Sequence, residues 1–144
     1  MKISTIIAAS VSALALVQPS QARAESQEFI EALFAAFNSH NVEKLKTFYA
    51  DDAVVHSPES CEPTVGRDAI SEGYAAMFQQ IPDVHDALEL VVTEGERTAV
   101  IFTASSRIPG AEFELPISAF LTIKDGKITE DRVFFNSDME LNCN

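Results

Sequence analysis

The second half of the chain places the strongest limit on its fold. Between residues 87 and 136 the sequence consists of four apolar segments with short turns between them, at Gly95, at Pro109-Gly110 and at Asp125-Gly126. An Asp-Gly pair between two apolar runs is the strongest short-range signal of a β-hairpin. We therefore predict four long antiparallel strands joined in sequence, over 87–93, 97–108, 112–123 and 127–136.

The first half is helical in pattern for most of its length. Apolar side chains recur every three or four positions over 26–38, which indicates a helix with one apolar face. A second helix over 42–50 follows, with Asn41 as its expected N-cap, and a third is predicted over 66–81. Between the second and third helices, the short β-branched run 53–57 predicts one more strand.

Helices followed by a run of antiparallel strands predict an α+β fold. We expect a single domain, residues 25–144, in which N-terminal helices cover one face of a strongly curved antiparallel sheet. A concave sheet covered by helices leaves a blind pocket between the two layers, and such a pocket suits a small apolar ligand.

The first 24 residues are predicted to be a secretory signal peptide rather than part of the fold. Lys2 supplies a positive charge, residues 6–17 form a short apolar run, and Ala22-Arg23-Ala24 matches an A-x-A cleavage site. The apolar run is too short to span a bilayer. The mature chain is expected to begin at Glu25 and to be secreted or periplasmic.

The acidic composition excludes two classes of partner. Removal of Lys2 and Arg23 with the signal leaves 8 basic residues against 22 acidic ones, a formal charge of −14. Such a surface repels nucleic acid and anionic membranes, and no basic stripe in the sequence reverses the effect. We therefore expect neither as a partner.

The mature chain keeps two cysteines, Cys61 and Cys143. In an oxidising compartment such a pair in a small domain is most simply a disulfide, and two free thiols are the alternative. Closing a loop of about 80 residues stabilises by about 4 kcal/mol in the chain-entropy model. Neither the cysteines nor the three histidines have the spacing of a metal site, so no metal is expected.

Several short stretches in this order resemble a known superfamily. After two helices come "YADDAVVHSP" (49–58), "GRDAI" (66–70), "IPD" (81–83), four strands and "DGKITE" (125–130). The pattern is similar to the nuclear transport factor 2-like superfamily, and within it to the SnoaL-like and ketosteroid isomerase-like branch. The resemblance covers about 27–141. It implies a cone-shaped α+β barrel, usually a homodimer formed through the outer face of the sheet.

The resemblance does not extend to the ketosteroid isomerase active site. Those enzymes carry a proton-shuttling aspartate where this chain has Ser57, and an oxyanion-binding tyrosine where it has Leu33. Their second oxyanion acid falls at Ala119 or Ser118, depending on one gap. A serine is no base near neutral pH without an activating neighbour. The chain is therefore not expected to be a ketosteroid isomerase.

The SnoaL-like branch is matched better at His56, where it often has histidine. That branch commonly follows "DGKI" with Glu-His-Trp-Asp, and its aspartate serves as acid or base in the cyclases. Residues 130–133 are Glu-Asp-Arg-Val here, so the aspartate position is Val133, and a further acidic position is Asn136. These departures argue against polyketide-type cyclisation.

His56 is the candidate proton carrier. In a strand, Val55 and Ser57 face one side while Val54 and His56 face the other, so His56 and Ser57 are not expected to act together. A neutral imidazole in a cleft titrates near working pH and serves as acid or base. The alternative is a structural histidine bonded to a nearby loop carbonyl.

Candidate ligand-binding residues lie on the last hairpin and the third helix. If Lys124 pairs with Lys127 in a regular hairpin, the register places Leu121 opposite Glu130, Ala119 opposite Arg132 and Leu115 opposite Asn136. Arg132 and Asn136 would then face the pocket as ligand contacts, with a rim or dimer-face position as the alternative. Tyr74 stands on the apolar side of the third helix, as a ligand contact or as core.

Two function classes remain open. The first is a secreted SnoaL-like protein that binds a small apolar organic molecule in a blind pocket, with cofactor-free acid–base catalysis of isomerase, cyclase or dehydratase type through His56. Arg132 or Asn136 would then stabilise developing negative charge. The second is a non-catalytic ligand-binding or dimeric interaction module that has lost the family's catalytic acids.

Overall fold

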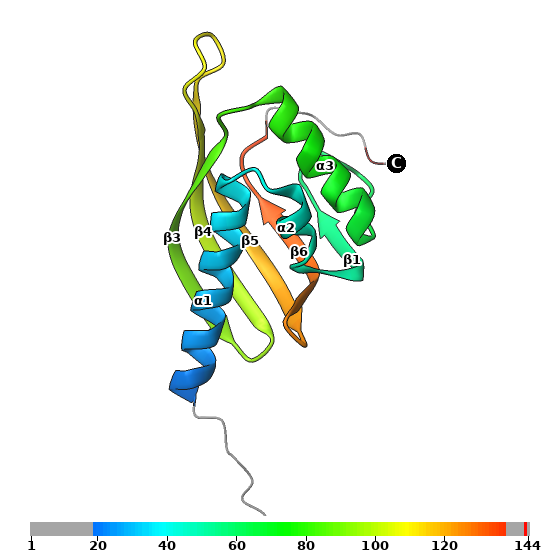
Figure 1. Cartoon of the computed structure of the whole chain (residues 1–144), viewed down its shortest axis with the longest axis vertical. Helices are drawn as coiled ribbons and strands as arrows, with labels where there is room; N and C mark the ends of the chain where they lie inside the picture. Colours follow the sequence, from blue (N-terminus) through cyan, green and yellow to red (C-terminus); the bar gives the residue numbers. More distant parts are fainter. Residues whose placement is uncertain (1–18, 138–142, 144) are drawn as a thin grey trace, which may run out of the picture.

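The computed structural model describes residues 19–137 and Cys143. Its elements follow one another as α1 (Pro19–Asn38), α2 (Val42–Lys46), β1 (Tyr49–His56), β2 (Thr64–Val65), α3 (Arg67–Gln80), β3 (His85–Glu94), β4 (Arg97–Ser106), β5 (Phe113–Lys124) and β6 (Lys127–Phe134) (Figure 1). No helix in the described part of the chain has the length and apolar character needed to cross a membrane.

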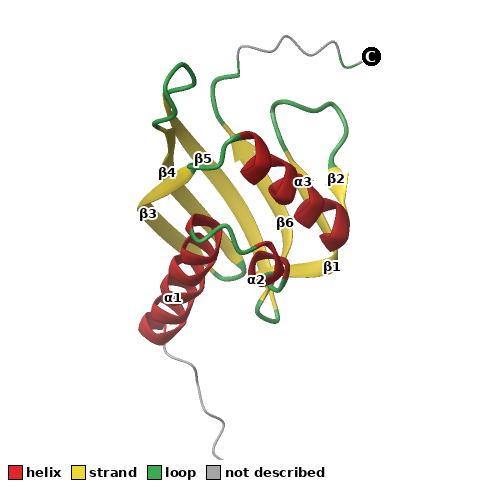
Figure 2. Ribbon diagram, turned by 45° about the horizontal axis from the view of Figure 1, so that its top comes forward, coloured by secondary structure: helices red, strands yellow, loops and turns green. Residues whose placement is uncertain are grey.

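The strands form one six-stranded sheet in the order β2-β1-β6-β5-β4-β3. β3, β4, β5 and β6 pair antiparallel in sequence, which confirms the predicted four-strand run, whereas β1 pairs with β6 in parallel. The sheet is strongly curved and does not close on itself, and all three helices lie on its concave side (Figure 2). The predicted α+β fold is confirmed.

The second helix is shorter than its sequence pattern indicates. Asn41 caps it as predicted, since its side chain accepts a hydrogen bond of 2.9 Å from the Lys44 amide. The helix ends at Lys46, because the chain at Phe48 already pairs with β6: the Ile128 amide donates to the Phe48 carbonyl at 2.8 Å. The predicted continuation to residue 50 is therefore wrong, and Tyr49 begins β1 instead.

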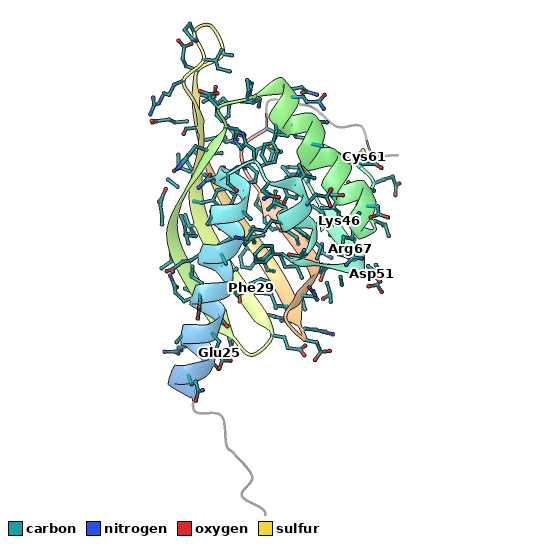
Figure 3. The ribbon with its side chains drawn as sticks, viewed as in Figure 1. Glu25, Phe29, Lys46, Asp51, Cys61 and Arg67 are labelled. Atoms are coloured by element: carbon teal, nitrogen blue, oxygen red, sulfur yellow. A yellow bond between two sulfur atoms is a disulfide. The ribbon has the colours of Figure 1, made fainter. Side chains whose placement is uncertain are left out.

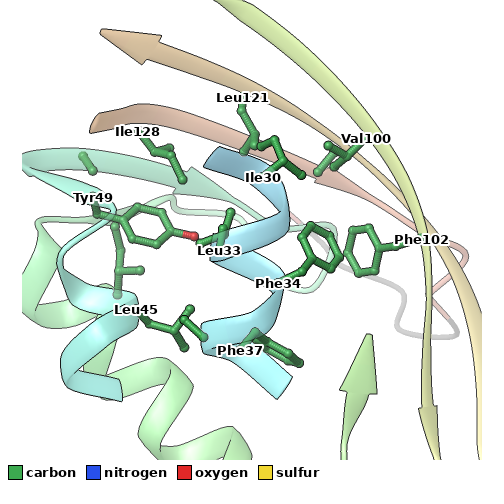
Figure 4. Packing of buried hydrophobic residues seen from close by; sticks show 14 of the residues in the cluster. Ile30, Leu33, Phe34, Phe37, Leu45, Tyr49, Val100, Phe102, Leu121 and Ile128 are labelled. Atoms are coloured by element: carbon green, nitrogen blue, oxygen red, sulfur yellow. The ribbon is translucent and has the colours of Figure 1, made fainter. Parts of the chain in front are cut away.

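The core lies between α1 and the concave face of the sheet (Figure 4). Ile30 is fully buried, and the ring of Phe34 meets Phe102 of β4 edge to face, with the ring centroids 5.1 Å apart. Burying side chains of this size stabilises by roughly 1.5–3 kcal/mol each. This packing holds α1 against the sheet, and it forms one wall of the space described below.

The last hairpin contains a β-bulge that shifts its register. Lys124 pairs with Lys127 as predicted, but Thr122 pairs with Glu130, so Thr129 is an extra residue on β6. The Thr129 hydroxyl donates to the Thr122 carbonyl at 3.2 Å. A slip of one residue turns every later side chain to the other face of the sheet.

Two predicted pairs of this hairpin are consequently wrong. Leu121 lies opposite Asp131 rather than Glu130, and Ala119 lies opposite Val133 rather than Arg132. The third predicted pair involved Asn136, which follows the end of β6. The regular register was the natural expectation for an Asp-Gly hairpin, and the bulge reverses which side chains face the helices.

The ends of the chain bear on two further predictions. Cys61 and Cys143 form a disulfide with a Cα–Cα distance of 5.4 Å, as predicted, and it fastens the C-terminal end to the loop after β1. Residues 1–18 of the predicted signal peptide lie outside the described residues. The predicted cleavage after Ala24 falls within α1, where residues 21–25 are exposed, and it stays a prediction.

Candidate functional site

A cavity of about 740 Å³ lies between the concave face of the sheet and the helices. Most of its wall is apolar, and the side chains come from all three helices, from strands β1 to β6 and from the neighbouring loops. Its larger apolar members are Leu33, Phe34, Phe37, Phe102, Phe113 and Leu121. A space of this size and character accepts a small organic molecule.

Asp131 of β6 is the most deeply placed charged residue of this wall. Its side chain is 6% exposed, and its Oδ1 atom has no hydrogen-bond partner. Burial raises the pKa of Asp131 to about 7, while the hydroxyl of Tyr49, 3.5 Å from Oδ2, opposes that rise. The carboxyl group can therefore hold or release a proton near neutral pH.

Two tyrosine hydroxyls on the cavity wall form a chain of contacts with this carboxyl group. The Tyr49 hydroxyl lies 2.7 Å from the Tyr74 hydroxyl, and Figure 4 shows it pointing toward α1, where Leu33 lies. Burial is the main cause that raises the pKa of both tyrosines, and the negative charge of Asp131 adds to it. Both phenols are therefore neutral and able to donate hydrogen bonds.

Asp86 is a second carboxyl group on the cavity wall, at the start of β3. It is 9% exposed, its Oδ1 atom has no partner, and burial raises its pKa to about 7. The side chain of Asn38 holds its backbone at both sides, accepting from the Asp86 amide at 2.8 Å and donating to the Asp86 carbonyl at 2.9 Å. The end of α1 thus fixes where this carboxyl stands.

The position of α3 brings Tyr74 to the cavity. Near its start, Arg67 Nη2 lies 2.7 Å from Asp51 Oδ1, and Lys46 Nζ lies 2.6 Å from Asp68 Oδ1 (Figure 3). Such exposed pairs contribute little to stability because water screens them, but they join α3 to β1 and α2. Tyr74 lines the cavity and also packs against the hydrophobic core, and its contact with a ligand stays a prediction.

His56 and Arg132 face the opposite side of the sheet. The predicted alternation along β1 is confirmed, but the cavity side is that of Val55 and Ser57. His56 Nε2 lies 3.5 Å from Glu130 Oε1, and Arg132 Nη2 lies 2.6 Å from the same oxygen. The three side chains form a partly exposed cluster on the convex face, away from the cavity.

Asn136 also takes no part in the cavity wall. It is exposed after the end of β6, whereas its neighbour Phe135 lines the cavity. The pocket-facing positions predicted for Arg132 and Asn136 are thus wrong, and the bulge at Thr129 is the physical reason for Arg132. His56 is not among the described residues that line this cavity, and its role as a proton carrier stays untested.

The comparisons with known proteins agree with this architecture. The family model of the SnoaL-like domain matches residues 30–131, more than half of the chain. The chain belongs to the SnoaL-like domain family.

Solved structures similar to this SnoaL-like domain show the same fold at low sequence identity. A hypothetical protein with a ketosteroid isomerase-like fold from Catenulispora acidiphila, in complex with trimethylamine, is 23% identical, with a TM-score of 0.69 over 76% of this chain and 85% of that one. A putative polyketide cyclase from Sinorhizobium meliloti is 23% identical, with a TM-score of 0.63 over 74% and 94%. TerC, co-crystallised with polyporic acid, is 22% identical, with a TM-score of 0.67 over 76% and 90%.

Sequence reasoning missed the acids of this SnoaL-like domain. Asp131 lies on the same face of β6 as Val133, the position at which the resemblance puts the branch's aspartate, because two residues along a strand share a face. The sequence signal that could have found Asp131 is its spacing of two from Val133 and Phe135, which puts the three residues on one face of a strand. Tyr49 was assigned to a helix, and nothing in the local sequence marked Asp86 as buried.

Proposed function

We propose that this SnoaL-like domain binds a small apolar organic molecule in the cavity and exchanges a proton with it, without a cofactor. The observation that carries the proposal is the buried, unpartnered Oδ1 atom of Asp131 on the wall of an otherwise apolar cavity. Two similar structures, one in complex with trimethylamine and one co-crystallised with polyporic acid, support a small-molecule ligand for this fold.

We assign to Asp131 the role of proton carrier that the sequence analysis gave to His56. A carboxyl group with a pKa near 7 serves both as base and as acid close to neutral pH. When the Tyr49 hydroxyl donates to the Tyr74 hydroxyl, the neutral Tyr74 hydroxyl donates in turn to a ligand oxygen, and so stabilises negative charge that develops on it. These roles suit isomerisation, cyclisation or dehydration next to a carbonyl group.

Proton exchange is testable before any natural substrate is known. Tetralone, a small apolar ketone with exchangeable α-hydrogens, is incubated with the protein in heavy water, and exchange is followed by NMR. We expect the wild-type protein to accelerate the exchange and Asp131→Asn to lose roughly 10²–10⁴ of the rate, the usual contribution of a general base. His56→Ala is the matched control and keeps the wild-type rate.

Ligand binding is measured separately, by the fluorescence of Nile red, a neutral apolar dye. If Nile red binds but exchange of tetralone is no faster than in buffer, the non-catalytic binding module is the correct class. If exchange is equally fast with Asp131→Asn, Asp131 is not the proton carrier.

We also propose export of the mature chain, residues 25–144, to the periplasm or the outside of the cell. The signal-like segment 1–24 supports this, as does a disulfide, which persists in oxidising compartments. Mass spectrometry of the protein recovered outside the cytoplasm should give an N-terminus at Glu25. An intact N-terminus in a cytoplasmic fraction would contradict the proposal.

A homodimer through the convex face of the sheet is the last part of the proposal. This face carries exposed apolar side chains, among them Ile101, Phe120 and Phe134, and the latter two rings meet edge to face with centroids 5.8 Å apart. Contiguous exposed apolar side chains of this size mark interaction surfaces. Light scattering should report a dimer for the wild-type protein and a monomer for Phe120→Glu, and a wild-type monomer would refute it.

A further inference from the structure

Asp86 is a buried carboxyl group that the proposed proton exchange does not use. Buried carboxylates in proteins are ordinarily paired with a cation or hydrogen bonded, because an isolated buried charge is costly. Here Asn38 contacts only the backbone of Asp86, and the Oδ1 atom has no partner. The described part of the protein thus supplies no cation to this group.

The ionisable groups around the cavity all have the same sign or are neutral. They are Asp86 from β3, Asp131 from β6, Tyr49 from β1, Tyr74 from α3 and Glu59 from the loop after β1. Among the described lining residues there is no Lys, Arg or His. The side chains contributed by α1, α2, β4 and β5 are not ionisable. An anionic ligand therefore meets only repulsion from charged groups on this wall.

Aromatic rings add to the attraction for positive charge. Phe34 and Phe102 pack together on the cavity wall, and Phe102 belongs to β4, the strand that pairs with β3 and so with Asp86. Tyr74 is close enough to Asp86 for that carboxylate to raise the pKa of the tyrosine. The face of an aromatic ring is electronegative and attracts cations. The overall formal charge of −12 acts in the same direction over longer distances.

We propose that Asp86 anchors a protonated amine carried by an apolar ligand, so that the ligand itself completes the buried ion pair. This inference rests on the proposed function only in that the cavity binds small molecules. Asp86 then selects organic ammonium compounds, while Asp131 with its two tyrosines remains free to act on the rest of the ligand.

Three probes of similar size and different charge test the selection. Naphthylmethylamine is a cation at neutral pH, naphthylmethanol is neutral, and naphthoate is an anion. Calorimetry with the full mature protein should show the amine binding about tenfold more tightly than the alcohol, the difference between a charge-assisted and a neutral hydrogen bond, and naphthoate most weakly.

The isosteric variant Asp86→Asn should remove the preference for the amine and keep the affinity for the alcohol. Asp125→Asn is the matched control: it removes one exposed carboxylate from the β5–β6 turn, and Asn-Gly suits this turn as well as Asp-Gly. It should keep the wild-type preference. Loss of the preference in Asp131→Asn but not in Asp86→Asn would place the ammonium group at Asp131 and overturn the assignment.

A pH series with Asp131→Asn, which leaves Asp86 as the one buried carboxyl group on the described cavity wall, tests the proposal even if Asp86→Asn does not fold. Because the pKa of Asp86 is about 7, a bound cation displaces a proton below that pH, and the affinity for the amine should fall roughly tenfold for each pH unit below about 7. The alcohol should show little change. Equal affinities of amine and alcohol with intact Nile red binding would refute the amine anchor alone, whereas no binding of any probe or of Nile red would refute the binding cavity as well.

Discussion

The hydroxyl oxygens of Tyr49 and Tyr74 lie 2.7 Å apart, although one residue begins the first strand and the other is in the middle of the third helix. They are the only two tyrosines of the chain. Their contact links α3 to the sheet at the place where Asp131 faces the cavity. The same hydrogen bond therefore supports both the packing of α3 and the chemistry proposed for the site.

Removing both hydroxyls of this pair should destabilise the protein by less than the sum of the two single removals. Tyr49→Phe leaves the buried Tyr74 hydroxyl and Asp131 without this partner, at a cost of about 1–3 kcal/mol in the free energy of unfolding. In a double-mutant cycle, the Tyr49→Phe/Tyr74→Phe variant should lose about 0.5–3 kcal/mol less than the sum of the single variants. Urea denaturation measures all four proteins, and simple additivity would show that the two hydroxyls are not coupled.

Stability should fall as the pH rises from 5 to 8. Burial raises the pKa of Asp86 and of Asp131 from 3.8 to about 7, so the folded state holds protons that the unfolded chain has already released. The free energy of unfolding that these two protons contribute is fully present below about pH 4 and is lost as the pH rises through 7. The loss is on the order of 4 kcal/mol for each carboxyl group.

Substitutions of single carboxyl groups check the source of this dependence. Asp131→Asn and Asp86→Asn should each flatten the plot of unfolding free energy against pH, because the amide does not titrate. The exposed Asp125→Asn should leave the slope unchanged. Equal slopes in Asp131→Asn and Asp125→Asn would show that the buried carboxyl is not the titrating group.

Gly73 offers a way to narrow the cavity without harming the fold. It lies on the cavity wall within α3, and a Cβ atom added there meets no heavy atom within 4 Å. Replacing a glycine inside a helix stabilises by roughly 0.5–1 kcal/mol. Gly73→Leu should keep or raise the melting temperature and weaken Nile red binding, whereas Gly73→Ala raises stability alone. Unchanged binding in Gly73→Leu would place the dye elsewhere.

Loss of the disulfide should be costly for a domain of this size. Cys61 and Cys143 are 82 residues apart, and closing such a loop stabilises by about 4 kcal/mol in the chain-entropy model. The Cys61→Ser/Cys143→Ser variant should lose roughly that amount in urea denaturation. The oxidised and reduced wild-type proteins provide the control pair, and equal stability of the two would contradict a structural disulfide.

Much of the fold could be predicted from local patterns in the sequence. Short turns such as Asp125-Gly126 have few backbone solutions, so they marked the hairpins, and the helical apolar period marked α1 and α3. The end of α2 could not be predicted because the Phe48 carbonyl accepts a hydrogen bond from Ile128, some 80 residues later in the chain, instead of continuing the helix. Local propensity does not include such distant partners.

Which side chains of β6 face the cavity depends on one extra residue in that strand, which shifts its register against β5. The sequence by itself determined that side chains alternate along β1 and β6, that Cys61 and Cys143 can pair, and that a curved sheet carries a cavity under its helices. Only the tertiary structure decided which set of alternating side chains faces that cavity. The bulge at Thr129 turned Asp131 inward and Arg132 outward, and a bulge depends on pairing between strands rather than on the residues of one strand.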